Sequence, residues 1–161
     1  MAIRIVTDST SEISREEAKK LNIEIIPMTI NFGDETFIDG VDITNKEFYK
    51  RLRVAEKLPK TSLINSETFI SRFEKYSDED DVIGIFISSE LSGSLQSAMI
   101  AKDSLPTKKI HIVDSIQVSF GLTALVLYAI RLRDEGKTAK EIVEAIEEAK
   151  NRLVVIAVID D

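Results

Sequence analysis

The stretch VIGIFI, residues 82–87, decides the fold, and Ser88 and Ser89 follow it directly. A short apolar run without a polar position is typical of a strand buried on both faces of a parallel sheet. Patterns of β-branched and apolar residues predict further strands elsewhere in the chain. These lie at residues 3–7, 23–30, 36–38, 109–113 and 153–159.

Helices are predicted between these strands. Three capping boxes, which start at Ser14, Thr44 and Thr138, each place a Glu three residues after the cap. The predicted helices cover residues 15–21, 45–53, 66–76, 94–104, 120–135 and 139–151. Phe48, Tyr49 and Leu52 are expected to face inward. Alternation of strands and helices predicts an α/β fold, a mostly parallel sheet with helices on both faces, in one domain over residues 1–161.

Composition excludes several classes of function. The chain has 161 residues, 21 Lys plus Arg against 28 Asp plus Glu, a net charge of −7, no Cys and one His. The negative charge argues against nucleic acid and against docking on anionic lipid headgroups. Without Cys, the chain has no thiolate nucleophile and no thiolate metal ligand. The longest apolar stretch, residues 122–132, is too short to span a bilayer. We expect a cytoplasmic protein.

Hydroxyl residues gather where the predicted strands end. They occur in residues 7–11, 88–94 and 114–115, and Thr61-Ser62 lies in a predicted loop before a helix. Parallel strands end at one edge of the sheet, and ligands bind there. Hydroxyls beside helix N-termini would form a neutral, donor-rich pocket for a small anion. The alternative is that these residues only cap helices, because Ser, Thr and Asp are the preferred caps.

Catalytic machinery is not evident. The chain has no G-x-S-x-G, Walker or G-x-G-x-x-G motif. His111 falls inside a predicted strand, which favours a structural or surface role, and the helix carboxylates are interpreted as a solvated face. Residues 122–130 form either a buried core helix or the wall of an apolar cavity.

The ordered motifs resemble those of the DegV family of bacterial fatty-acid-binding proteins. The resemblance covers the whole chain, and its most specific block is SSELSGSLQSA, residues 88–98. It also includes Asp8-Ser9-Thr10, Thr61-Ser62 and Val113-Asp114-Ser115, in the same order.

The resemblance implies a carrier rather than an enzyme, which binds one long-chain fatty acid and presents it to a fatty acid kinase. By position, Thr61 and Ser92 would bind the carboxylate. The supporting residues would be Ser62, Gly93, Ser94, Asp8, Ser9 and Ser115. No cofactor other than the bound fatty acid and no metal are expected.

Family members are nearly twice as long, so the chain is expected to be the N-terminal half of a two-domain protein. The absent half, or self-association, would then cover an exposed face. Two other functions remain open. One is an enzyme acting on a phosphosugar or small polyol, because hydroxyl-rich helix N-termini also bind phosphate. The other is an interaction module in which every Ser and Asp only caps a helix.

Overall fold

The computed structural model describes residues 1–156 and contains two sheets. The larger sheet is wholly parallel, in the order β2-β1-β6-β7. Its strands are β1 (Ile3–Asp8), β2 (Ile23–Ile26), β6 (Asp81–Phe86) and β7 (Lys109–Asp114). The smaller sheet is antiparallel, in the order β4-β3-β5. Its strands are β3 (Thr29–Phe32), β4 (Glu35–Ile38) and β5 (Lys60–Ser62).

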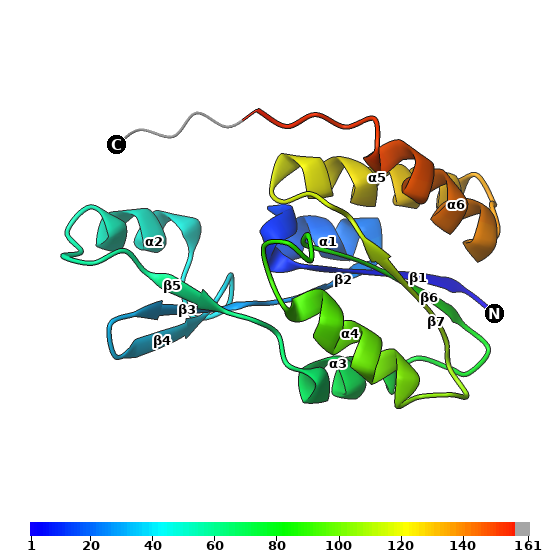
Figure 1. The fold of residues 1–161 in the computed structure, drawn as a ribbon, viewed down its shortest axis with the longest axis horizontal. Coiled ribbons are helices and arrows are strands. Elements are labelled where there is room, and N and C mark those ends of the chain that lie inside the picture. The colour runs from blue at the N-terminus through cyan, green and yellow to red at the C-terminus, as the bar shows by residue number, and fades with distance from the viewer. Residues whose placement is uncertain (157–161) are drawn as a thin grey trace.

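Helices cover both faces of the parallel sheet, as Figure 1 shows. On one face lie α1 (Arg15–Leu21), α5 (Phe120–Asp134) and α6 (Ala139–Lys150), and on the other lie α3 (Ser66–Phe73) and α4 (Ser94–Asp103). A short 3₁₀ helix, η1 (Ser9–Ser11), follows β1. The remaining helix, α2 (Asn45–Leu52), sits with the smaller sheet in a lobe beside the main body (Figure 1). The predicted fold class is confirmed.

Side-chain alternation along the central strands creates two apolar cores. Ile83 and Ile85 of β6 pack toward α5 and α6, whereas Val82 and Phe86 pack toward α3 and α4. All four are nearly or completely buried. Burial on both faces explains why this strand has no polar alternation.

Gly84 occupies the middle of β6, on the face that also carries Phe86. A Cβ at position 84 would lie 2.4 Å from the Phe86 ring, which packs edge-on against Phe69 with centroids 5.0 Å apart. The glycine therefore leaves the space that the aromatic ring fills.

The predicted helix starts are accurate. Ser14 and Thr138 each form a full capping box with the Glu three residues later. Thr44 and Asn65 each accept a hydrogen bond from the backbone N–H three residues on. Local side-chain chemistry thus determines where these helices begin.

Three predictions about strands are wrong. The single strand over 23–30 is two strands in different sheets, separated at Pro27, which has no N–H for a ladder hydrogen bond. The loop over 58–64 contains β5, which pairs with β3. Of the last predicted strand, 153–159, residues 153–156 are not in a strand, and 157–159 lie outside the described residues. Tyr49, expected to face inward, is 59% exposed.

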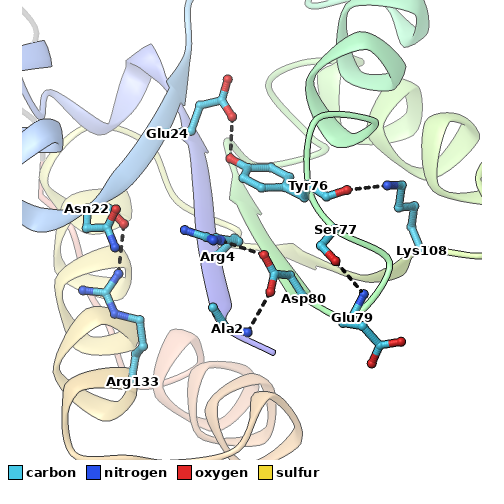
Figure 2. A network of polar contacts seen from close by, with 10 residues as sticks. All are labelled: Ala2, Arg4, Asn22, Glu24, Tyr76, Ser77, Glu79, Asp80, Lys108 and Arg133. Atoms are coloured by element: carbon cyan, nitrogen blue, oxygen red, sulfur yellow. Dashed lines mark hydrogen bonds and ion pairs between the residues drawn. The ribbon is translucent and has the colours of Figure 1, made fainter.

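A polar network closes the amino end of the parallel sheet (Figure 2). The Asp80 carboxylate accepts hydrogen bonds from Arg4 Nε at 2.9 Å and from the Ala2 backbone N–H at 2.7 Å. Both bonds hold the pKa of Asp80 below its ordinary value, and the bond from Arg4 has the larger effect. The Tyr76 hydroxyl donates a hydrogen bond to Glu24 of β2. Its burial is the main cause that raises its pKa, and the bond to Glu24 is the second cause. The network joins the first strand to the turn before β6.

We expect Gly84→Ala to destabilise the fold by about 1–3 kcal/mol, because the added methyl group overlaps the Phe86 ring. Urea denaturation of wild type and variant measures the difference. In a Phe86→Leu background the same glycine change should cost less, since the ring is gone. Equal costs in both backgrounds would contradict the steric explanation.

We expect Asp80→Asn to weaken the pH dependence of stability in the acid range. A lowered folded-state pKa stabilises the protein above the ordinary carboxyl pKa, and this stability is lost as pH falls through the lowered value. Thermal unfolding from acid to neutral pH should show a lower Tm for the variant at neutral pH and a shallower decline on acidification. Asp103→Asn, at an exposed position of α4, is the control and should keep the wild-type profile.

Candidate functional site

The carboxyl ends of β1, β6 and β7 bring three polar loops together. Backbone hydrogen bonds tie the loops to each other. Ser115 N–H donates to the Phe86 carbonyl at 3.2 Å, and Ser119 N–H donates to the Thr10 carbonyl at 2.9 Å. The three hydroxyl clusters that follow these strands therefore lie at one edge of the sheet.

Asp8 fixes this edge from inside. Its side chain is completely buried. One carboxylate oxygen accepts the Ile87 N–H at 2.8 Å, and the other accepts the N–H and hydroxyl of Thr10 at 2.9 and 2.5 Å. Burial raises the pKa of the carboxyl above its ordinary value, against the opposite effect of these bonds. Asp8 thus holds the loop after β1 against the end of β6.

Ser92, Gly93 and Ser94 form the start of α4. Ser94 is completely buried, and its Oγ accepts the Ile64 N–H at 3.0 Å. Ser92 Oγ lies 3.0 Å from Ser94 Oγ and accepts the Ser94 N–H at 3.2 Å. A Cβ at Gly93 would lie 3.1 Å from Leu63 Cδ2. The segment that follows β5 therefore crosses directly over this turn.

Thr61 and Ser62 lie on opposite faces of the small sheet. Thr61 pairs with Ile30 of β3, and paired residues of antiparallel strands project to the same face. Ser62 accepts a hydrogen bond from Asn31 Nδ2 at 3.0 Å on the other face. Both side chains are exposed. Thr61 therefore shares its face with Ile30, and Ser62 does not.

A cavity of about 510 Å³ lies beside this edge. It is bounded by η1, the ends of β2 and β3, α2 and the loop after β7. Its apolar lining is Ile13, Ile25, Ile30, Phe48 and Val118, and its polar lining includes Ser9, Thr10, Ser14, Thr44, Asn45 and Tyr49. Arg15, Glu12 and Asp39 add charged groups.

Sequence reasoning missed the contribution of α2 to this cavity. The available signal was Pro27, which ends β2 and sends the chain out into the lobe that carries α2. The suggested cavity wall, residues 122–130, lies in α5. Leu122, Leu125 and Val126 of this helix are buried in the core, and no α5 residue lines the cavity.

Two further supporting residues, Ser9 and Ser115, hydrogen-bond to the backbone. Ser9 is one of the residues that line the cavity, and its Oγ accepts the Met28 N–H at 3.1 Å. Ser115 Oγ is buried and exchanges two 3.1 Å hydrogen bonds with the Gln117 backbone. Ser9 therefore ties η1 to the segment after β2, and Ser115 stabilises the turn after β7.

His111 lies away from this edge. Its Nε2 is 3.1 Å from Asp81 Oδ1, at the beginning of β6. Within residues 1–156, no group of three or more His, Cys, Asp or Glu side chains could hold a metal ion. No helix in the same part of the chain is long and apolar enough to cross a membrane.

Residues 2–161 match the family model described as "Uncharacterised protein, DegV family". The chain belongs to the DegV family. A DegV domain-containing protein of Clostridium perfringens is 39% identical over 152 residues, which cover 94% of this chain and 54% of the relative. This DegV-family chain spans about half the length of the curated relatives it matches.

Two solved structures share the fold. One is described as fatty acid binding of a DegV family protein from Thermus thermophilus, with 30% identity, a TM-score of 0.84, and coverage of 94% of this chain and 54% of that one. The other is described as a stearic acid-binding protein from Eubacterium ventriosum, with 30% identity, a TM-score of 0.82, and coverage of 91% and 52%. The family resemblance drawn from the motifs is thereby confirmed.

We expect Ser94→Ala to destabilise the protein by about 1–3 kcal/mol, because the buried Ile64 N–H loses its acceptor. Urea denaturation measures the loss, and hydrogen exchange should show weaker protection of the Ile64 amide. Ser104→Ala is the matched control, since Ser104 is exposed at the end of the same helix. An unchanged Ile64 exchange rate would contradict the role given to Ser94.

Proposed function

We propose that the chain binds one long-chain fatty acid as a carrier and performs no chemistry on it. The observation that carries this proposal is the partly apolar cavity of about 510 Å³ beside a hydroxyl-rich sheet edge. Its volume falls within the range of small-molecule sites, about 300–1,000 Å³. The descriptions of the two solved relatives as fatty-acid-binding and stearic acid-binding proteins support the same ligand class.

The acyl chain would supply most of the affinity. Burial of about 14 methylenes at about 0.8 kcal/mol each is worth roughly 11 kcal/mol before ordering costs. Ile25, Ile30 and Phe48 offer apolar contacts in the cavity. The hydroxyl groups then have to orient the carboxylate rather than provide the bulk of the binding energy.

We assign the carboxylate to Thr61 and Ser92. Neither residue is among those that line the cavity, but Thr61 projects on the same face of the small sheet as Ile30, which does line it. Ser92 Oγ accepts the Ser94 N–H and forms a hydrogen bond with Ser94 Oγ in which either hydroxyl can donate. In this proposal Ser94 donates, which leaves the Ser92 proton for a ligand. Gly93 and Ser94 support Ser92 through the turn.

The remaining supporting residues act at a distance from the carboxylate in this proposal. Asp8, Ser9 and Ser115 hold the loops, and Ser62 holds β5 through Asn31. A headgroup site built from neutral hydroxyls releases a carboxylate more readily than a buried Arg pair would, because charge-assisted hydrogen bonds are stronger. Easy release suits a carrier.

The phosphosugar alternative has less support. Glu12 and Asp39 line the cavity together with Arg15, and the two carboxylates would repel a phosphate dianion more strongly than the singly charged carboxylate of a fatty acid. His111 is bonded to Asp81 and lies away from the candidate site, so it offers no general base there. A purely structural module would not need a cavity of this size.

Three finer expectations remain predictions. The carrier would present its fatty acid to a separate fatty acid kinase, and it would act in the cytoplasm. The second half of a longer DegV-like protein, or self-association of this one, would cover the exposed face near the site. The kinase and the second half follow from the family resemblance, whereas the cytoplasmic location follows from the composition and apolar pattern of the sequence and self-association from the exposed face.

We expect Thr61→Ala and Ser92→Ala together to weaken palmitate binding by about 1–3 kcal/mol, or about 5- to 150-fold in Kd. Native mass spectrometry of protein loaded with palmitate should show one bound acid, and titration should give the change in Kd. Ser71→Ala is the control, because its exposed hydroxyl bonds only to the Thr68 carbonyl within α3.

Two results would contradict the proposal. The first is wild-type protein that carries no palmitate after loading but shows a thermal shift with a phosphosugar. The second is a double variant with the affinity of Ser71→Ala, which would remove Thr61 and Ser92 from the headgroup site while leaving fatty-acid binding itself intact.

A further inference from the structure

Positive charge is concentrated in one segment of this acidic chain. Residues 45–60, NKEFYKRLRVAEKLPK, contain six Lys or Arg and two Glu, whereas the whole chain has a net charge of −7. Apart from Lys60, the first residue of β5, the segment comprises α2 and the loop that connects it to β5, which we call the α2–β5 loop (residues 53–59). Both belong to the lobe beside the main body (Figure 1).

Only part of this charge is neutralised locally. Arg51 is paired with Glu35 at 3.0 Å and with Glu47 at 3.3 Å, and Lys50 approaches Glu47 at 4.0 Å. Within residues 1–156, the other four bases of the segment form no ion pair. They are Lys46, Arg53, Lys57 and Lys60, and all four are exposed.

Two aliphatic side chains stand among these bases. Val54 and Leu58 are each 81% exposed, among the highest values for apolar side chains in the structure. Arg53 and Lys57 directly precede them in the chain. Val54 and Leu58 are therefore each adjacent to a base that forms no ion pair within residues 1–156, and Glu56, which precedes Lys57, is the one carboxylate in the sequence of the loop.

The same helix borders the cavity. Asn45, Phe48 and Tyr49 of α2 line it, and Tyr49 is itself 59% exposed. A surface that contacts the α2–β5 loop would therefore lie close to one wall of the candidate fatty-acid site.

We propose that the α2–β5 loop docks the protein on an anionic lipid bilayer. Arg53 and Lys57 would contact lipid phosphates, and Val54 and Leu58 would insert among the acyl chains. A bilayer interface accepts separate aliphatic side chains without a matched recess, and basic residues bind its negative surface. This inference rests on the proposed function. Docking would bring the fatty-acid cavity to the lipid phase, in which fatty acids dissolve.

The test is co-flotation with vesicles of equimolar phosphatidylglycerol and phosphatidylcholine, compared with vesicles of phosphatidylcholine alone. Wild-type protein should float with the anionic vesicles only, and added salt should release it. Arg53→Glu with Lys57→Glu should weaken binding at least about 25-fold, at about fivefold per base removed. Val54→Ser with Leu58→Ser should also weaken it, with the charge unchanged.

Lys75→Glu with Lys102→Glu is the matched control, since both lysines are exposed on the main body and the change in net charge is identical. The proposal is overturned if wild type ignores anionic vesicles, or if the control loses as much binding as the loop variant. Binding to soluble polyglutamate without binding to vesicles would overturn it too, in favour of an acidic protein partner.

The docking and the fatty-acid proposals can fail separately. The loop variants alter no residue of the cavity or of the hydroxyl site, so they should bind palmitate in vesicle-free solution with wild-type affinity. Protein that floats with anionic vesicles but binds no palmitate refutes the proposed function and keeps the docking surface. Protein that binds palmitate but never floats with anionic vesicles refutes the docking surface and keeps the proposed function.

Discussion

The buried carboxylate of Asp8 is the constraint on which the candidate site depends. A carboxylate removed from water is costly unless its oxygens are hydrogen-bonded. Here three donors, two from Thr10 and one from Ile87, meet it in fixed positions. The geometry that satisfies the charge is also the geometry that holds the end of β1 against the end of β6. A raised pKa is the remaining sign that the burial is only partly compensated.

What could be predicted from sequence is local or follows from sheet symmetry. Ser14 and Thr138 mark helix starts because a capping box is complete within four residues. The run 82–87 indicates a central strand because burial on both faces leaves no polar position. Convergence of the hydroxyl clusters follows from the parallel direction of the strands, without knowledge of any single contact.

What could not be predicted depends on pairing between distant segments. Lys60–Ser62 has no apolar pattern and becomes β5 only because β3 offers it a free edge. Pro27 indicates that a strand ends there, but the sequence does not indicate where the chain runs after it. The cavity is lined by residues of η1, β3 and α2. These elements lie far apart in the sequence, and no sequence pattern indicates that they meet. Likewise Ile64 meets Ser94 across 30 residues, through one buried hydrogen bond.

Net charge is an average, and this molecule shows where the average misleads. The value of −7 argues against a surface that is basic throughout, as nucleic-acid binding requires. By the same average the sequence predicts no docking on anionic lipid headgroups, and the proposed role of the α2–β5 loop departs from that prediction. A docking surface needs only a few free bases within a Debye length of about 8 Å, where distant carboxylates are screened. Glu35 and Glu47 neutralise Arg51, but Arg53 and Lys57 have no such partner in residues 1–156. Local pairing, rather than composition, therefore decides which face of an acidic protein can meet an anionic surface.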